Sequence, residues 1–328
     1  KFERWRSEYT DVLSRLKQRR NRRLVRRKIL VSTSVAAVVA VVALFTLFLN
    51  YPEPGSVNLN ESGEHSKVQL QLANGHWLDL DTIKENRLMG MDHVNVSSGN
   101  KTLTYQHADN LQQMEYNILK TERGGEWNVT LEDGTKVYLN SSSTLKYPVS
   151  FAGESREVFL EGEAYFEVIA DPQKPFYVQV GEAKVQVLGT AFNVSAYQED
   201  QQVEVALLRG KVGFNLPNNE YVLVPGEIAT WDKGDREATL RKGNVESIID
   251  WKTGRFNFED MPLDRLTVKL ARWYGVQFMF EDETVKEFRF SGAVTKYRTL
   301  DYVLGMIAKT TKVAFQEKDG KILVRKIE

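Results

Sequence analysis

The stretch VQVLGTAFNVSAY, residues 185–197, has the composition of a β-strand, but its alternating pattern changes in the middle. Apolar side chains occupy odd positions as far as Val187 and even positions from Phe192 onward. Because successive side chains of a strand point to opposite faces, this change would turn the buried face of a regular strand toward solvent. We therefore predict a β-bulge at Gly189 and Thr190, which lie between the two halves and reset the register.

The sequence on both sides of this stretch predicts an all-β domain, a sandwich or roll, over residues 114–248. Short alternating runs follow one another over residues 126–231, and turn signals such as Asp171-Pro172 and Pro225-Gly226 separate them. Regularly spaced short strands without a helical period are typical of such domains.

Two stretches of the chain repeat each other as predicted β-hairpins. Residues 68–80 (VQLQLANGHWLDL) and 127–139 (WNVTLEDGTKVYL) align without gaps at an offset of 59. Asn74-Gly75 and Asp133-Gly134 stand between alternating apolar residues, a pattern that indicates type I′ turns. We assign the first hairpin to residues 50–113, together with a polar linker that precedes it.

From residue 249 onward the pattern predicts a smaller α+β domain. Residues 262–280 and 299–317 align at an offset of 37, and each copy combines an amphipathic helix with a following strand. Asp264 and Asp301 fall in the first turns of these helices, where the helix dipole favours a carboxylate. Because a strand also precedes each helix, residues 249–328 are expected to form a βαββαβ-like unit.

Residues Ile29 to Leu49 predict one membrane-spanning helix. None of these 21 residues is charged, and about 20 apolar residues cross the hydrocarbon core of a bilayer. Residues 1–28 carry 12 Lys and Arg against 3 Asp and Glu, and such an excess stays in the cytoplasm. The arginine-rich run could also mark a nucleic-acid patch, but its position directly against the span favours topology. We therefore expect a single-pass membrane protein with residues 50–328 outside the cytoplasm.

Composition argues against catalysis and metal binding. The chain has no cysteine, and its four histidines all lie before residue 108, whereas most nucleophilic catalysis and most zinc sites need one or the other. The best support for an enzyme is that Glu161 and Glu163 could act as acid and base on a sugar stacked against Tyr165. Both glutamates fall on one face of an alternating strand, which favours a solvated polar face. No catalytic residue, metal or cofactor is predicted.

Several blocks of the sequence, in the same order, resemble FecR-type anti-sigma factors. The blocks LEDGTKVYLNSSSTLKYP, REVFLEGEAYFEV, VQVLGTAFNV and PGEIATW resemble the periplasmic domain of that family. The blocks RFNFEDMPLDRLTVKLARWYGVQFMFED and FRFSGAVTKYRTLDYVLGMI are similar to the C-terminal domain of the version found in Bacteroidetes. The resemblance covers residues 115–328 and includes the preceding membrane helix.

This resemblance implies a regulator in the bacterial inner membrane. Its cytoplasmic N-terminus would hold an extracytoplasmic-function sigma factor, with no direct contact to nucleic acid. Its periplasmic part would receive a signal from the signalling domain of a TonB-dependent outer-membrane transporter, ahead of cleavage by periplasmic and intramembrane proteases. Residues 1–28 have helical spacing and are then expected to be the end of a truncated sigma-binding domain. The alternatives are a periplasmic carbohydrate-active enzyme and a membrane-tethered scaffold that does not switch.

The resemblance also bears on individual residues. Some FecR-like regulators cleave themselves at a Gly-Thr bond, which corresponds here to Gly189-Thr190. For the transporter signal we expect an open sheet edge in the C-terminal domain, at residues 288–294 or 321–327. The partner-binding candidates on these segments are Phe288, Phe290, Lys321 and Leu323. The large aromatic residues are expected to form core and interdomain packing: Trp127, Phe159, Tyr165, Phe166, Trp231, Trp251 and Trp273.

Overall fold

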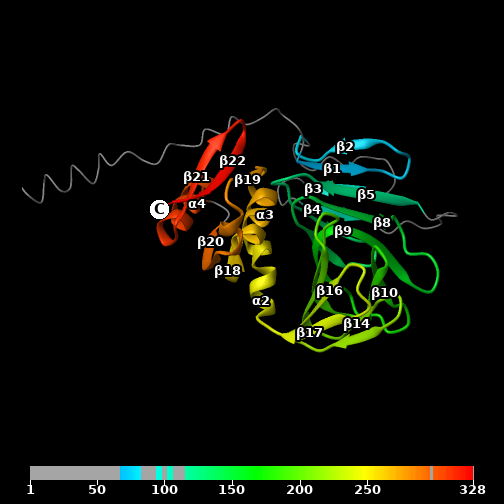
Figure 1. Cartoon of the computed structure of the whole chain (residues 1–328). Coiled ribbons are helices and arrows are strands. Elements are labelled where there is room, and N and C mark those ends of the chain that lie inside the picture. Colours follow the sequence, from blue (N-terminus) through cyan, green and yellow to red (C-terminus); the bar gives the residue numbers. More distant parts are fainter. Residues whose placement is uncertain (1–66, 83–93, 98–101, 106–114, 296–297, 328) are drawn as a thin grey trace, which may run out of the picture. The chain divides into compact units, whose positions relative to one another are not determined.

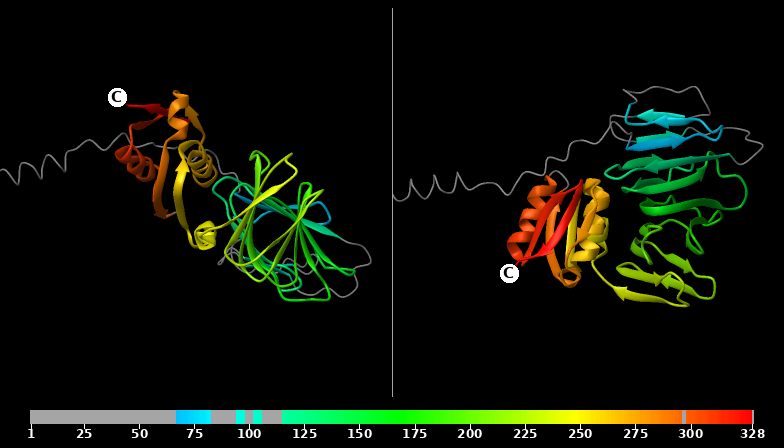
Figure 2. Two further views of the ribbon diagram at one scale, coloured as in Figure 1. Left: turned by 60° about the horizontal axis from the view of Figure 1, so that its bottom comes forward. Right: turned by 45° about the horizontal axis from the view of Figure 1, so that its top comes forward.

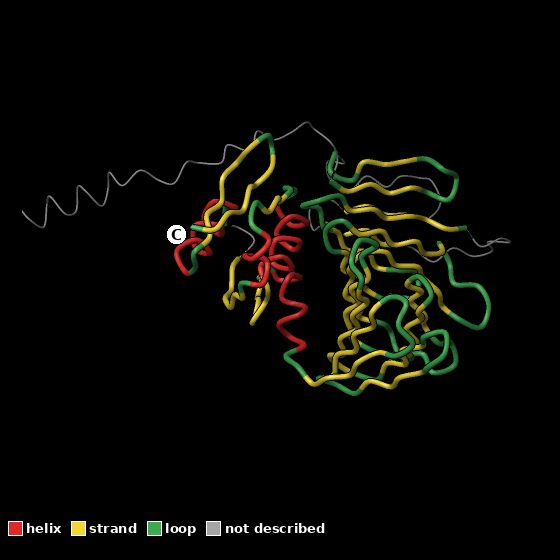
Figure 3. The backbone as a smooth tube through the Cα atoms, in the orientation of Figure 1, coloured by secondary structure: helices red, strands yellow, loops and turns green. Residues whose placement is uncertain are grey.

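The computed structural model describes residues 67–82, 94–97, 102–105, 115–295 and 298–327 (Figure 1). Every helix of these ranges lies after residue 243, whereas strands run through all of them (Figure 3). None of these helices is long and apolar enough to cross a membrane. The predicted span Ile29–Leu49 and the tail 1–28 lie outside the described residues.

Two sheets form the β domain, and strand β9 belongs to both. In the first sheet the order in space is β2, β1, β5, β8, β9, β10, β11, β14 and β15, and only β9 and β10 are parallel neighbours among these described strands. Their bounds are Trp77–Asp79, Val68–Gln71, Tyr116–Thr121, Ser143–Pro148, Arg156–Glu167, Phe176–Val180, Ala183–Val187, Val212–Asn215 and Glu220–Leu223. Figure 2 shows β1 and β2 (cyan) at one end of the domain and the yellow-green strands that follow residue 210 at the other.

The second sheet has the spatial order β3, β4, β6, β7, β9, β12, β13, β16 and β17, with β4 and β6 parallel. Apart from β9, the bounds are Val94–Ser97, Thr102–Tyr105, Trp127–Thr130, Lys136–Leu139, Ala191–Ala196, Gln202–Arg209, Glu227–Asp232 and Ala238–Lys242. Apolar side chains of both sheets form one core. At its centre Phe166 of the second sheet stacks on Phe192 at 5.1 Å and meets Phe176 of the first sheet at 6.3 Å. The predicted all-β domain is confirmed.

Strand β9 passes from one sheet to the other at Gly162. Its first half pairs with β8 and β10 in the first sheet, and its second half pairs with β7 and β12 in the second. Gly162 has a φ of +99°, and a Cβ there would lie 2.6 Å from the Cα and Cβ of Ser143 on β8. The Ser143 hydroxyl accepts a hydrogen bond from the Glu163 backbone N–H at 2.9 Å. The bend therefore requires a residue without a side chain.

Both predicted hairpins are present, but their turns differ from the type I′ geometry that we expected. In the first, the Gly75 N–H donates to the Leu72 carbonyl at 2.8 Å and the Leu72 N–H donates to the His76 carbonyl at 2.9 Å. Among the described turn residues of this hairpin only Gly75 has a positive φ. The loop is therefore a three-residue type I turn closed by a left-handed glycine, and residues 131–135 repeat the same bonds. The first hairpin also extends the first sheet, because β1 pairs with β5.

The prediction of a β-bulge at Gly189 and Thr190 is wrong, although the side chains do change faces there. β11 ends at Val187 in the first sheet and β12 begins at Ala191 in the second, so the residues between them are a crossing, not an insertion in one ladder. The parity changes because the chain presents its other side to the shared core on reaching the opposite sheet. A register shift does occur nearby, where Leu208 of β13 is the extra residue opposite Ala191 and Phe192.

The C-terminal part has the predicted α+β character, with one strand more than expected. It begins with helix α2 (Val245–Ile249) and the 3-10 helix η1 (Asp250–Thr253). The elements that follow are β18 (Arg255–Pro262), α3 (Leu263–Tyr274), β19 (Phe278–Phe280), η2 (Glu283–Glu287), β20 (Arg289–Thr295), α4 (Leu300–Thr310), β21 (Val313–Lys318) and β22 (Lys321–Lys326). Strand β18 pairs with β20, and β22 lies between β19 and β21. Asp264 and Asp301 lie in the first turns of α3 and α4, as predicted. A separate apolar core holds this domain together.

We predict that Gly162→Ala destabilises the protein by about 2–4 kcal/mol, because the alanine adds steric overlap with Ser143 to an unfavourable positive φ. Gly153→Ala is the matched control: its φ is +81°, and no atom lies within 4 Å of the added Cβ. That variant is expected to lose only about 1 kcal/mol. Urea unfolding of both variants measures the difference, and equal losses would show that the approach to Ser143 is unimportant.

Candidate functional site: the crossing and the face of β12

The crossing Leu188–Thr190 is held by main-chain bonds to the segment that follows β9. The Val168 N–H donates to the Thr190 carbonyl at 2.9 Å, and the Asp171 N–H donates to the Leu188 carbonyl at 2.8 Å. Between these two bonds the chains touch, since a Cβ on Gly189 would lie 2.6 Å from Ala170. Glycine at position 189 is thus required by close packing of two backbones.

The Thr190 side chain is buried and points to a neighbouring turn. Its hydroxyl donates to the Lys211 carbonyl at 2.9 Å and receives a longer bond from the Lys211 N–H at 3.5 Å. Gly210 allows the backbone of this turn to approach closely. A Cβ at Gly210 would lie 2.8 Å from the Thr190 hydroxyl oxygen and 3.0 Å from the Gly189 carbonyl oxygen. The Thr190 hydroxyl and the Gly189 carbonyl oxygen thus both lie against the backbone of Gly210.

Glu161 and Glu163, the two carboxylates considered for an acid–base pair, face different cavities. Glu161 is exposed and lines an open groove of about 1030 Å³, with Phe159 and Lys146 among its other walls. Glu163 lines a small cavity of about 80 Å³ on the other side of Gly162. A glycosidase places both groups on one bound sugar, and this arrangement does not.

Tyr165 is also unsuited to the carbohydrate-active alternative. Its ring is 3% exposed and packs with Ala191 and Trp251, so no sugar ring reaches it. Burial raises the pKa of Tyr165 to about 12, which keeps the phenol neutral. The predicted packing role is confirmed for this residue, for Trp251 and Trp273 beside it, and for the core residues Trp127, Phe166 and Trp231. Phe159 is an exception, since it lines the open groove.

Glu163 is the titratable group with the most unusual surroundings on this face. Its two carboxylate oxygens accept hydrogen bonds from the side-chain amides of Asn140 at 2.8 Å and Asn193 at 2.9 Å. Burial raises the pKa of Glu163, while the charge of Lys269 and the two amide bonds oppose that rise. The Asn193 Oδ1 atom beside it is buried without a partner among the described residues. Glu163 therefore sits in a polar pocket, neither free in solvent nor paired at contact distance with a cation.

The outer face of β12 is covered, although its sequence predicted one buried face only. Phe192 and Val194 point to the sandwich core, while Ala191 and Asn193 on the other face are 3% and 1% exposed. Trp251 of η1 lies over Ala191. The cover thus comes from the segment that leads into the C-terminal domain.

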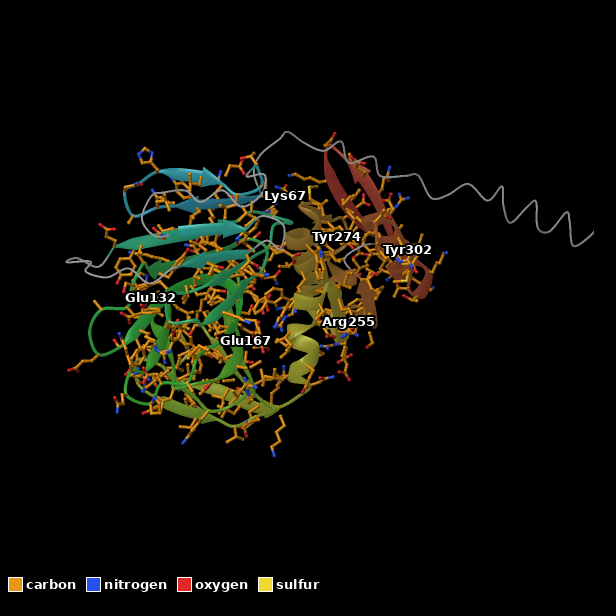
Figure 4. All side chains as sticks on the ribbon, turned by 180° about the vertical axis from the view of Figure 1, so that it is seen from behind. Lys67, Glu132, Glu167, Arg255, Tyr274 and Tyr302 are labelled. Atoms are coloured by element: carbon orange, nitrogen blue, oxygen red, sulfur yellow. The ribbon has the colours of Figure 1, made fainter. Side chains whose placement is uncertain are left out.

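Lys252 fixes this covering segment at the start of β12. Its ammonium group lies 2.7 Å from the Glu167 carboxylate at the end of β9; Figure 4 labels Glu167 and Arg255, the first residue of β18. The same ammonium stands 3.9 Å from the ring centre of Tyr138 and 4.5 Å from that of Tyr165. Two aromatic faces and a carboxylate together form a favourable site for a cation.

Arg272 of α3 makes a second cation contact just beyond the other end of β12. Its guanidinium donates to Glu199 at 2.9 and 3.1 Å and to Asp200 at 2.5 and 3.1 Å. It also stacks on Tyr197, with 3.7 Å between its central carbon and the ring centre. The Arg272 carbonyl in turn accepts a hydrogen bond from the Gly124 N–H at 2.9 Å.

The four partner-binding candidates fall in different environments. Phe290 is 5% exposed and belongs to the core of the C-terminal domain, and Phe288 packs partly against that core. β22 is hydrogen-bonded on both sides, so the prediction of an edge at residues 321–327 is wrong. Lys321 is exposed and Leu323 half-buried. Among the described strands β20 pairs only with β18, so one of its edges is open, as is one edge each of β18, β19 and β21.

Sequence reasoning missed the contacts of Lys252 and Arg272. Lys252 stands in a short 3-10 helix without a periodic pattern, and Arg272 is one of four charged residues on its helix, with Asp264, Arg265 and Lys269. The acidic pair Glu199-Asp200 reads as an ordinary polar turn. The sequence of a helix does not indicate which distant turn its arginine contacts, and Asp200 and Arg272 are 72 residues apart.

Comparisons with known proteins agree with this architecture. A family model described as FecR protein matches residues 117–213, from β5 to β14, and one described as FecR, C-terminal, matches residues 255–324. Two crystal structures of a "putative anti-sigma factor" from Parabacteroides distasonis ATCC 8503, at 1.65 and 2.50 Å resolution, are similar to the chain, each with 30% identity and a TM-score of 0.61. They cover 64% and 65% of this chain, and the chain covers 99% and 100% of theirs. No curated protein matches the chain.

We predict that Glu163→Gln changes how stability depends on pH. Because burial raises the pKa of Glu163, the folded protein binds more protons than the unfolded chain between the ordinary and the raised pKa. Stability of the wild type therefore falls as pH rises through that interval, and glutamine removes this loss. The melting temperature of Glu163→Gln minus that of the wild type should be greater at about pH 8 than at about pH 4.5. Glu161→Gln, an exposed neighbour, is the control; a flat difference for Glu163→Gln would contradict the prediction.

Proposed function

Because the chain belongs to the FecR family, we propose that it is a membrane-anchored anti-sigma regulator. The observation that carries this proposal is the pair of family matches in the right order, together with the similarity over almost the whole length of the crystallised anti-sigma protein. The N-terminal side would lie in the cytoplasm and bind an extracytoplasmic-function sigma factor. The span Ile29–Leu49 would anchor the chain in the inner membrane, with residues 50–328 in the periplasm.

We infer further that the C-terminal domain receives the signal. The proposed partner is the signalling domain of a TonB-dependent outer-membrane transporter. Adding a strand to the open edge of β20 would provide main-chain hydrogen bonds to that partner. Phe288, next to this edge and partly exposed, would contribute a side-chain contact. Periplasmic and intramembrane proteases would then release the sigma factor.

Two measurements on the full-length protein test this function. The sigma factor is expected to co-purify with the protein from membranes, and to be lost when the residues before Ile29 are removed. The signalling domain is expected to slow hydrogen exchange of the β20 amides, residues 289–295. Failure of the sigma factor to co-purify with the full-length protein would favour the scaffold alternative, and equal recovery without the N-terminal residues would contradict binding by that segment. Protection found only outside β20 would disprove the proposed docking edge.

A slow self-cleavage between Gly189 and Thr190 is proposed as a maturation step. The Thr190 hydroxyl would attack the Gly189 carbonyl carbon, the carbon–nitrogen bond would break, and the hydroxyl proton would pass to the leaving nitrogen. Water would then hydrolyse the resulting ester to a Gly189 carboxylate and the free Thr190 hydroxyl. The hydrogen bond from Thr190 to the Lys211 carbonyl supports this step, because it restrains the orientation of the hydroxyl that would attack.

Intact mass spectrometry tests the cleavage. Wild-type protein is expected to give fragments 1–189 and 190–328 on prolonged incubation, and Thr190→Ala is expected to remain whole because it lacks the nucleophile. Thr190→Ser keeps the hydroxyl and should still be cut. A wild-type chain that stays whole would reduce Gly189-Thr190 to a crossing between two sheets.

A further inference from the structure

The contact between the β domain and the C-terminal domain contains little apolar packing. Each domain has its own large core, and the cluster between them is small among the described residues. Its buried members are Tyr165, Ala191 and Trp251, and Tyr138, Leu208, Ile249 and Trp273 pack partly against them. Beside that cluster lies the polar cavity of about 80 Å³ that Glu163 and Lys269 line. Interfaces of this kind inside a chain are typical of domains that move relative to each other.

The segment between the domains is fixed to the β domain. Val245 of α2 packs in one cluster with Ala206 and Ile228 of the second sheet. Lys252 is held by Glu167 and by two tyrosine rings. Trp251, between them, is 7% exposed, and its indole N–H has no partner among the described residues. Residues 245–253 therefore form an anchored belt on the second sheet.

Gly254 is the first residue after this belt and the last before β18. It ends η1 in the left-handed region, with a φ of +72°. Such a glycine at the end of an element can absorb a large change in φ and ψ, as hinge residues do. A turn at Gly254 leaves the contacts of Val245 and Lys252 with the second sheet in place. It separates Asp250 of the belt from Asn257 and Arg255 of β18, and Trp251 from Trp273.

Beyond Gly254, Arg272 makes the strongest polar contact with the β domain. Its side chain is 10% exposed, whereas Glu199 is 61% and Asp200 33% exposed. A guanidinium so well covered is costly to leave unpaired in place. The two acidic side chains, by contrast, are readily hydrated once the arginine has left. The contact should therefore be either fully made or fully broken, with the domain moving as a unit.

We propose that Arg272 is a latch that holds the C-terminal domain closed over the end of β12, and that the domain opens about Gly254 when this latch is released. Opening uncovers the polar cavity with Glu163 and Ser195 and frees the ring of Tyr197. The belt 245–253 stays on the second sheet. This inference does not depend on the sigma factor or the transporter proposed above.

Distance measurements between two spin labels test the latch on the full-length protein. The chain has no cysteine, so labels can be placed at Glu182→Cys in the β domain and Lys309→Cys on α4, both of which are exposed. Wild-type protein is expected to give one narrow distance distribution. In Arg272→Ala the fraction of molecules with distances outside that distribution should rise about tenfold or more. Each hydrogen bond to a charged group changes an equilibrium constant by about tenfold or more, and the variant loses several such bonds.

Two further variants make the test specific. Asp200→Asn removes one partner from the other side of the contact and should open the domain in the same direction, which covers the case that Arg272→Ala does not fold. Arg289→Ala removes an exposed ion pair to Asp260 within the C-terminal domain and should leave the distribution unchanged. The latch is disproved by a broad distribution in the wild type, by a narrow one in both Arg272→Ala and Asp200→Asn, or by equal broadening in Arg289→Ala.

Discussion

The close approach of Gly162 to Ser143 is the contact on which both sheets depend. At this point β9 leaves β8 and β10 and takes β7 and β12 as neighbours. A side chain there would push β9 away from Ser143 of β8 and strain the bend at which β9 changes sheets. The bend also sends Glu161 and Glu163 to different cavities, although they are two residues apart on one strand. The missing Cβ at Gly162 thus permits the change of sheet and, with it, the separation of Glu161 from Glu163.

Much of the fold could be predicted because it follows from local sequence patterns. The repeat of the two hairpins, the alternation along β9 and the helices with Asp264 and Asp301 in their first turns all appear in the structure. The crossing at Gly189 was located correctly but misinterpreted. The break in the alternating pattern shows that the buried side of the strand changes. Either a β-bulge or a move of the chain to the opposite sheet produces such a break. Only the partners of β11 and β12 distinguish the two.

The parts that could not be predicted depend on pairing over long distances. β22 looks like a possible edge strand from its composition, but its position between β19 and β21 follows from how the two repeats pack. The second buried face of β12 likewise comes from Trp251, more than fifty residues later in the chain. Partial burial by another domain leaves no periodic signal in a strand.

The shared strand has a consequence for how the protein is made. The first sheet takes β14 and β15 from the chain after the crossing, and the second takes β3, β4, β6 and β7 from the chain before it. Neither sheet can be completed from one continuous half of the sequence. Strands β1 to β11 can pair with one another, but the outer edge of β11 and one side of the second half of β9 lack their partners β14 and β12 until these strands have followed. Pairing between strands so far apart in the chain favours slow folding. Completion of the domain therefore comes late, and both layers are built on the shared strand β9.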